Sequence, residues 1–400
     1  MNPPVDLTNP DNYTHGVPHD AFRQLRAEDP VSWQAGPGGR GFWAVTRYHD
    51  VVTVLRTPKV YSSWLGGALL ADPPPEFLGK LREGMLNRDP PDHTMLRRLV
   101  NRAFSPRRVE ELDGRIAEHA RALVTRVRGA GRCDFATEIA GEMPLFVICE
   151  ILGVPHEDRS ALYALTARMF GSEIADPAAA FADGMAAAEQ IRAYGAELGR
   201  RKAAAPSDDM VSDLLTAEIE GRRLTEGEFQ AFFMLLFNAG ADTTRSLLCF
   251  GFDLLLDRPR ELELLRRDPA LLPAAIEEIL RFEPPVIQFR RTATQDTELG
   301  GRQIEAGDKV VVFFPSANRD EAVFAEPDRF DIARTPNEHL AFGYGTHFCL
   351  GAPLARLESK HVLREVLAQL TGLERAAPLV PARTNFIRTV RHLEIAFASS

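Results

Sequence analysis

Apolar and polar residues follow a helical period over most of this chain and a two-residue period in a few short runs. The clearest helical segment begins after Thr225, which forms a capping sequence with Glu228, and it continues through apolar residues to the stop at 257–259. Its roughly 30 residues correspond to about 45 Å. Because apolar residues cover most faces of this segment, we expect it to cross the protein core.

Strand-like runs lie on both sides of the helical region. The runs 42–46, 286–291 and 309–314 are rich in β-forming residues and end at turn-forming ones, whereas another helical pattern follows residue 349. With no linker rich in Pro, Gly or Ser, we expect a mainly α chain with a minor β region in one domain, 1–400. Its β-rich parts are expected near 31–60 and 286–335, and its helical parts at 92–281 and 350–370.

Composition and charge narrow the class of protein. The net charge of −9 at pH 7 argues against nucleic acid as the main partner. The four cysteines are too few and too scattered for a disulfide scaffold or a zinc site, which indicates a reducing compartment. Neither a signal peptide nor a run of about 18 apolar residues is visible, so we expect a cytoplasmic protein that does not span a membrane.

Segment 342–351 contains the strongest chemical signal. It reads Phe-Gly-Tyr-Gly-Thr-His-Phe-Cys-Leu-Gly, which places Cys349 among glycines and directly before a helical pattern. Glycines allow a backbone to approach a bound group closely, and the N–H groups at a helix start favour a thiolate. A single cysteine is also often just a buried structural residue, so the local chemistry leaves both interpretations open.

The pattern Phe-x-x-Gly-x-x-x-Cys-x-Gly resembles the haem-thiolate signature of the cytochrome P-450 superfamily, and further motifs follow in the family's order. The resemblance covers nearly the whole chain. It implies a triangular, helix-rich fold with a long central oxygen-binding helix, and haem b as the cofactor. In that resemblance Cys349 is the axial iron ligand, Phe342 shields the sulfur, and Gly345 and Gly351 let the loop lie close to the macrocycle.

The middle of the long helix, Ala-Gly-Ala-Asp-Thr-Thr at 239–244, contains polar residues that are costly inside an apolar helix. A solvated kink or a helix-packing contact is one interpretation. The resemblance implies another, in which Gly240 opens a pocket for O2, Thr243 hydrogen-bonds the oxygen, and Asp242 relays protons to it.

A Glu-x-x-Arg pair at Glu278 and Arg281 is weak on its own, because acid–base pairs with this spacing are common on solvated helices. Its position about 70 residues before Cys349 matches the family. The segment 327–330 resembles the family segment whose arginine joins the pair. The resemblance therefore implies that Glu278, Arg281 and Arg329 form a buried network beneath the haem-binding core.

Haem propionates need cationic or hydrogen-bonding partners. His93 and Arg97 are four residues apart and therefore share a helical face, which matches a propionate-binding pair in many bacterial members of the family. His347 and Arg291 complete the set that the resemblance implies. Arg290 is the alternative to Arg291, because successive strand residues face opposite ways.

By the same analogy a largely apolar substrate pocket is expected, although each of its residues could instead belong to the core. The pocket residues that we expect are Trp64, Met85, Met169, Phe170, Asn238, Ala241, Val286, Ile287, Gln288 and Phe386. The strand and loop sequences at 286–293 and 316–320 resemble those of actinobacterial members that oxidise steroids and branched lipids.

The resemblance implies a monomeric monooxygenase that uses O2 to hydroxylate an apolar steroid, terpenoid or lipid-like molecule. Electrons would come from a ferredoxin and an NAD(P)H-dependent ferredoxin reductase. Macrolide, aromatic and peptide substrates, a peroxide-driven hydroxylase and a non-catalytic haem sensor remain alternatives, whereas no hydrolase motif is present. Several basic residues could either guide ferredoxin docking or simply form a solvated surface: Arg98, Arg102, Arg107, Arg108, Arg356 and Lys360.

Overall fold

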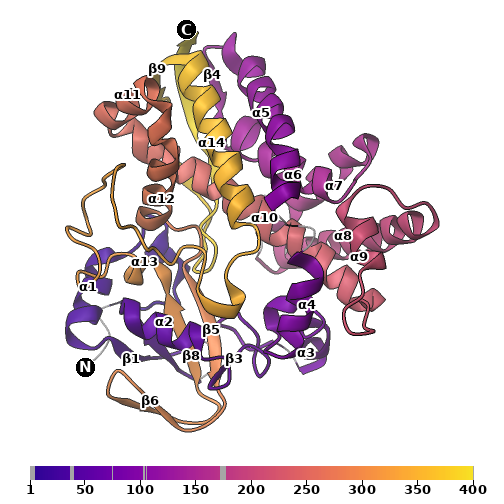
Figure 1. Cartoon of the computed structure of the whole chain (residues 1–400). Helices are drawn as coiled ribbons and strands as arrows, with labels where there is room; N and C mark the ends of the chain where they lie inside the picture. Colours follow the sequence, from indigo (N-terminus) through magenta and orange to yellow (C-terminus); the bar gives the residue numbers. More distant parts are fainter. Residues whose placement is uncertain are drawn as a thin grey trace.

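A large helical region and a smaller β-rich region lie side by side in the molecule (Figure 1). The computed structural model of the chain describes residues 5–36, 40–73, 75–101, 104, 106–171 and 177–399. Among these residues, no helix has the length and apolar character needed to pass through a bilayer. The expectation of a mainly α chain with a minor β region is confirmed.

Helix α10, Glu226–Leu256, crosses the middle of the helical region. The hydroxyl of Thr225 accepts a hydrogen bond from the Glu228 N–H at 3.2 Å, and the Glu228 carboxylate accepts one from the Thr225 N–H at 3.0 Å. This capping box satisfies N–H groups that would otherwise lack partners at the helix start. The helix packs against α6, α8, α12 and α14, so its apolar faces are covered from several directions.

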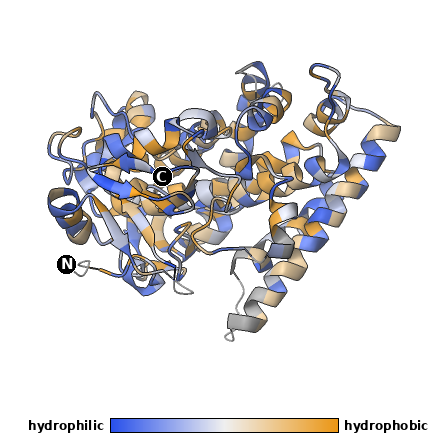
Figure 2. Cartoon of the chain, turned by 90° about the horizontal axis from the view of Figure 1, so that it is seen from below, coloured by the Kyte–Doolittle hydropathy of each residue, from blue (hydrophilic) through white to orange (hydrophobic). Residues whose placement is uncertain are grey.

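The other helices surround α10. In Figure 1, α5 to α9 lie on one side of it, and α11, α12 and α14 extend toward the end of the molecule that carries the C-terminus. Figure 2 shows apolar and polar residues alternating along these helices. The bounds are α4 Asp92–Asn101, α5 Pro106–Arg128, α6 Glu142–Ile151, α7 His156–Gly171, α8 Pro177–Ala204, α9 Met210–Thr216, α11 Pro259–Arg267, α12 Leu272–Phe282 and α14 Ala352–Gln369.

The principal sheet of the β-rich region has the strand order β1-β2-β8-β5-β3. Strands β2 and β8 are parallel and the other neighbours are antiparallel. The bounds are β1 Val31–Gln34, β2 Phe42–Val45, β3 Tyr61–Ser62, β5 Gln288–Ala293 and β8 Lys309–Phe313. Helices α1 His19–Glu28, α2 Tyr48–Arg56, α3 Pro75–Leu81 and α13 Phe314–Ala317 accompany this sheet.

Shorter sheets complete the fold. A three-stranded sheet joins β4, Arg132–Asp134, to β12, Glu394–Ser399, and β9, Leu370–Arg375. It therefore ties the C-terminus to the helical region. Two hairpins are formed by β6, Thr297–Leu299, with β7, Arg302–Ile304, and by β10, Val380–Pro381, with β11, Val390–His392.

Candidate cofactor and substrate site

The loop before α14, which contains Cys349, lies between α14 and the β-rich region (Figure 1). The Cys349 N–H donates a hydrogen bond to the Phe342 carbonyl at 2.9 Å, which closes the loop on itself. Gly345 has a φ of 69°, and a Cβ there would lie 2.8 Å from the Leu55 carbonyl of α2. The structure thus assigns Gly345 to contact with α2, whereas a Cβ on Gly351 would meet open space.

Cys349 is surrounded by protein atoms and nevertheless has solvent-accessible surface. Burial raises the pKa of its thiol, while hydrogen bonds from the N–H groups of Gly351 and Ala352 at the start of α14 lower it. The side chain is nevertheless exposed. A residue that is surrounded by protein and still presents accessible surface faces an internal hollow. The thiol therefore points into a space that a bound group can occupy, with helix N–H groups behind it.

The face of α10 around Ala239 is also open. Ala239 is exposed and Thr243 is partly exposed, although Phe237, Ala241 and Ser246 along the same helix are buried. The Thr243 hydroxyl donates to the Ala239 carbonyl at 2.5 Å, a back-bond within the helix. Sequence analysis missed Ala239, because an alanine inside an apolar helix gives no chemical signal.

Gly240 has a different setting from the one expected. A Cβ on this residue would lie 2.8 Å from Cδ1 of Ile148 in α6. A side chain at this position would require the end of the Ile148 side chain to move, so Gly240 lies where α10 packs closely on α6. The role of Gly240 in an oxygen pocket stays a prediction.

Asp242 is buried, with 4% of its surface exposed, and it turns toward the C-terminal part of the chain. Its carboxylate accepts a hydrogen bond from the Thr389 hydroxyl at 2.5 Å. Burial raises the pKa of Asp242, and the bond from Thr389 and the charge of Arg245 oppose that rise. No local pattern indicated Thr389, because it lies 147 positions away from Asp242 along the chain.

Four basic side chains gather from three separate elements; His93 and Arg291 are buried, and Arg97 and His347 are partly buried. His93 and Arg97 come from α4, Arg291 from β5 and His347 from the Cys349 loop, and the His93 and His347 rings lie 4.1 Å apart. Neither ring nitrogen of His93 has a hydrogen-bond partner. Burial lowers the pKa of His93 to about 4 and that of Arg291 to about 10. We call these four residues the cation ring.

Within the described residues, no carboxylate forms an ion pair with the cation ring. Arg97 donates to the Asn101 side chain at 3.0 Å, and Arg291 donates to the carbonyl of Arg290 at 2.8 Å. The charge of Asp89 raises the pKa values of His93 and Arg291, but its carboxylate is held by Ser62 and Ser63. Buried cations without anionic partners fit the two propionates of a haem.

The choice between Arg290 and Arg291 follows from strand alternation. Arg290 pairs with Val311 and Arg291 with Val310 on β8, so the two side chains leave opposite faces of the sheet. The Arg290 guanidinium binds Asp72 at 2.7 Å, which satisfies its charge. Arg291 is therefore the member of the pair that belongs to the cation ring.

A second group of charged side chains surrounds the Glu278 carboxylate on α12, and we call it the Glu278 cluster. The Glu278 carboxylate accepts hydrogen bonds from Arg281 at 2.7 and 2.8 Å, and from Arg334 at 3.1 and 3.2 Å. The Arg329 side chain instead pairs with Glu326 and Asp331 and is 60% exposed. The expectation that Arg329 joins the pair is therefore wrong for its side chain. Only its carbonyl takes part, as an acceptor for Arg281 and Arg334.

Arg334 was missed because it lies four residues beyond the recognised segment 327–330. The chain turns at Asp331, whose N–H donates to Glu278 at 2.8 Å, and this turn brings Arg334 back over the carboxylate. The Asn337 amide also donates to Glu278, at 3.2 Å. Five donor groups thus surround a fully buried carboxylate.

The expected substrate residues have different environments. Ile287 is fully buried and belongs to a core cluster with Phe22, Phe42 and Phe313. Gln288 is 2% exposed and leaves the sheet on the face opposite Arg291. The roles of both residues in a substrate pocket stay predictions.

The remaining expected pocket residues stay as predictions. Val286 forms an isolated bridge with Ile387, and the Phe386 ring lies 5.5 Å from that of Phe289, so the C-terminal turn does reach the start of β5. The side chain of Phe170 lies outside the described residues. Trp64, Asn238 and Met169 are exposed or partly buried, whereas Met85 and Ala241 are buried.

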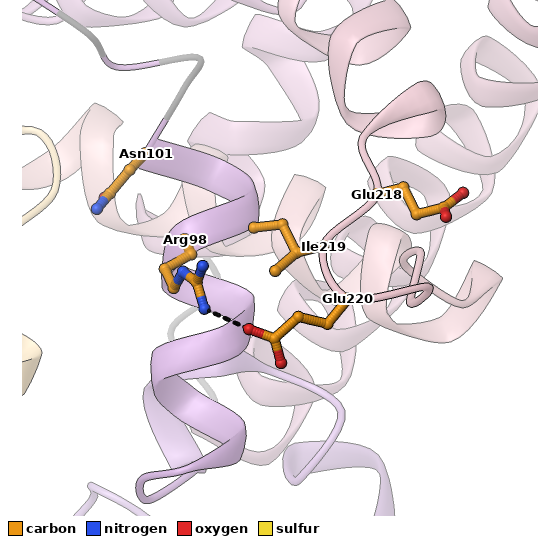
Figure 3. Close-up of a pocket in the computed structure, with 5 residues that line it drawn as sticks. All are labelled: Arg98, Asn101, Glu218, Ile219 and Glu220. Atoms are coloured by element: carbon orange, nitrogen blue, oxygen red, sulfur yellow. Dashed lines mark hydrogen bonds and ion pairs between the residues drawn. The ribbon is translucent and has the colours of Figure 1, made fainter.

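The basic residues considered for ferredoxin docking are largely neutralised by acidic neighbours. Arg98 pairs with Glu220 at 2.9 Å across a pocket that Asn101, Glu218 and Ile219 also line (Figure 3). The other pairs are Arg107–Glu111, Arg108 with Glu111, Asp208 and Asp213, and Arg356–Glu277. Arg102 lies outside the described residues. These pairs favour the interpretation of a solvated surface over a strongly positive docking patch.

Comparisons with known proteins agree with this arrangement. The sequence profile described as Cytochrome P450 matches residues 185–374. The chain is 41% identical to cytochrome P450 126 of Mycobacterium tuberculosis over 98% of its length and 97% of that protein. It is 36% identical to the steroid C26-monooxygenase of Rhodococcus jostii, with 99% of this chain and 85% of that protein covered.

A further relative and a solved structure extend the comparison. The methyl-branched lipid omega-hydroxylase of Mycobacterium bovis is 37% identical, over 94% of this chain and 90% of that protein. A Mycobacterium marinum cytochrome P450 solved in complex with pseudoionone superposes with a TM-score of 0.91 at 36% identity, and 99% of each chain is covered.

Proposed function

Because this chain belongs to the cytochrome P450 family and is a haem-thiolate monooxygenase with haem b as its cofactor, we propose that it hydroxylates an apolar steroid, terpenoid or methyl-branched lipid. The relatives that carry this proposal are named for a steroid and for a methyl-branched lipid, and the solved neighbour holds the branched isoprenoid ketone pseudoionone. These names and this complex support an apolar substrate class that includes steroids and branched lipids.

The single observation behind the site assignment is the Cys349 thiol, which is deep in the protein and still accessible. In our proposal this sulfur is the axial ligand of the haem iron. The N–H groups at the start of α14 stabilise its negative charge. Phe342 packs beside it, with the Arg356 guanidinium 4.6 Å from the ring centre, and limits the approach of water.

The cation ring would bind the haem propionates. Arg97 and Arg291 supply fixed positive charge, and His93 and His347 supply ring N–H donors, since the low pKa of His93 keeps that ring neutral at pH 7. An anion in this position would remove the penalty of burying two guanidinium groups without partners.

When bound, haem supplies the reductive activation of O2 and the insertion of one oxygen atom into a C–H bond. The chain contributes the proton path. Thr243 lies on the open face of α10; its own proton is donated to the Ala239 carbonyl, so its hydroxyl oxygen is free to accept a hydrogen bond, and Asp242 beside it is the proton source. The buried setting of Asp242 raises its pKa, so its carboxyl is closer to the protonated form than a solvated one.

Electron supply is the remaining part of the proposal. We infer that a ferredoxin, reduced by an NAD(P)H-dependent reductase, delivers single electrons to the side of the haem that faces α14. The ion pairs of Arg98, Arg107 and Arg108 predict only a modest salt dependence for this encounter, because their charge is already balanced. Reconstitution with purified ferredoxin and reductase, followed as NADPH oxidation against salt, measures it.

Two optical measurements test the core of the proposal. Cys349→Ser should abolish the red-shifted Soret band of the reduced carbon-monoxide complex, and an unchanged band would refute the ligand assignment. Steroids, branched fatty acids and isoprenoid ketones should each shift the bound haem from low to high spin when they enter the site. A panel in which only macrolides, aromatics or peptides cause that shift would overturn the substrate class.

A further inference from the structure

Thr389 is placed between the C-terminal turn and the oxygen-facing helix in a way that the proposed mechanism has not used. Its hydroxyl lies 2.5 Å from Oδ2 of Asp242 and 3.4 Å from the carbonyl of Ile387. A hydroxyl has one proton to donate, and the shorter contact, to a carboxylate, is the stronger one. Thr389 is 7% exposed, so water does not compete freely for this bond.

The backbone around Thr389 is held on both sides. The Thr389 carbonyl accepts from the Ala382 N–H at 2.8 Å, and the Arg388 N–H donates to the Pro285 carbonyl at 2.8 Å. The Arg388 side chain pairs with Glu283 and lies 3.9 Å from the Phe250 ring centre. Thr389 is therefore a fixed point, and the Asp242 side chain is the movable partner.

Asp242 lies at the border of the open face of α10. On a helix it is turned about 60° from Ala239 and about 100° from Thr243. One side-chain rotation can therefore carry its carboxyl from Thr389 toward the hollow or back. Besides Thr389, the charged and titratable groups that act on Asp242 are Arg245, one turn along the helix, and the buried thiol of Cys249.

We propose that Thr389 is the positioning residue for Asp242, holding its carboxyl beside the C-terminal turn until it rotates to supply a proton at Thr243. This inference rests on the proposed role of Asp242. It also links proton supply to the substrate pocket, because the turn that carries Thr389 carries Phe386 three residues earlier. The Phe386 carbonyl accepts from the Ile287 N–H at 2.8 Å, so a substrate pressing on this turn would act on the Asp242 bond.

The experiment compares Thr389→Val, which keeps the shape and removes the donor, with Thr389→Ser, which keeps the donor. In the haem-loaded protein, infrared spectra identify the Asp242 carboxyl band as the one lost in Asp242→Asn, and its titration with pH is followed in each variant. Losing the Thr389 bond should raise the titration midpoint of Asp242 by about one pH unit, and Thr389→Ser should restore it.

The second measurement is coupling, the fraction of the consumed reductant that appears as hydroxylated product. Thr389→Val should divert more of the reductant to hydrogen peroxide, severalfold above wild type, and Thr389→Ser should not. If Thr389→Val proves unstable, the same comparison is made between Thr389→Ala and Thr389→Ser. A midpoint that is identical in all Thr389 variants overturns the inference.

The Asp242→Asn variant distinguishes the positioning role of Thr389 from the proton role of Asp242. If this variant couples normally while Thr389→Val still shifts the Asp242 midpoint, the positioning contact stands and the proposed proton role of Asp242 fails. If Asp242→Asn uncouples the enzyme and Thr389→Val changes neither the midpoint nor coupling, the proton role stands and the Thr389 inference fails.

Discussion

The Glu278 cluster and the cation ring both place charged side chains inside the protein, but among the described residues only the first is neutralised by ion pairs. Around Glu278, two guanidinium groups, a backbone N–H and an amide donate to one carboxylate. In the cation ring, Arg97 and Arg291 have no carboxylate partner among the described residues, and His93 has no hydrogen-bond partner.

This difference distinguishes charged groups that stabilise the fold from charged groups that bind a ligand. A buried ion pair whose hydrogen bonds are all satisfied by protein groups has a structural role, and removing one partner leaves the charge of the other uncompensated. A buried cation without an anion is an incomplete arrangement that an external anion can complete. The contrast points to the ligand site more clearly than exposure or sequence pattern alone.

We expect the largest change in stability from a substitution in the Glu278 cluster. Glu278→Gln should lower the free energy of unfolding by about 3–5 kcal/mol, because Arg281 and Arg334 would remain buried with no balancing charge. Denaturant unfolding at neutral pH measures this change. Glu326→Gln is the matched control, since Glu326 pairs with Arg329 on the surface and its loss should cost less than about 1 kcal/mol.

The same comparison tests the correction at Arg329. Arg334→Ala removes a guanidinium that binds Glu278 directly and is 10% exposed, whereas Arg329→Ala removes one that is 60% exposed. If Arg329→Ala proved the more damaging of the two, the assignment of Arg334 to the cluster would be wrong.

Glu358 on α14 is a carboxyl with an incomplete set of partners, and its ionisation should depend on pH. Burial raises its pKa to about 8 from an ordinary 4.5, and its Oε2 has no hydrogen-bond partner. The folded state thus binds a proton that the unfolded state releases. The free energy of unfolding should therefore fall by up to about 4 kcal/mol as pH rises from 4.5 to 8.

Glu358→Gln should flatten that part of the pH profile. Its amide cannot ionise, so wild type and variant should differ more at pH 8 than at pH 5, with the variant the more stable at pH 8. Thermal or denaturant unfolding at several pH values measures the profile. Parallel profiles for the two proteins would show that Glu358 ionises without penalty.

The smallest effect concerns the cation ring. Arg291→Met removes a propionate partner, and haem should dissociate roughly tenfold faster, as expected for the loss of one charged hydrogen bond. Transfer of haem to an excess of apomyoglobin measures the rate. The haem-free variant should be no less stable than haem-free wild type, because the substitution removes an unpaired buried charge. If Arg291→Met destabilised the haem-free form, Arg291 would have a structural role like that of the Glu278 cluster, and not a role in binding the propionates.

Local sequence patterns were sufficient for the helical core and for most of the chemistry. The capping box at Thr225 and the stop before Pro259 predicted α10 closely, because both signals depend on hydrogen bonds within a few residues. The motif around Cys349 predicted a loop leading into a helix, and α14 begins at Ala352. Helical spacing predicted that His93 and Arg97 share a face, and the family resemblance supplied their role.

Local patterns were less informative where a residue's role depends on its neighbours in space. Gly240 and Gly345 were interpreted as making room for a ligand, and the structure shows that each also lies close to another element, at Ile148 and Leu55. Gln288 was assigned to the pocket without the strand register, which places it on the face opposite Arg291. Arg329 was chosen by motif, and the turn at Asp331 favoured Arg334 instead.

The sequence by itself determined that this chain forms a mainly α protein with a long apolar central helix and a cysteine placed for a haem-thiolate, since these properties depend on residues close together in the chain. Only the tertiary structure decided which charges balance each other. Thr389 meets Asp242 across 147 positions, and four basic residues from three elements meet beside one thiol. Contacts of that kind depend on how the whole chain packs, which no local pattern encodes.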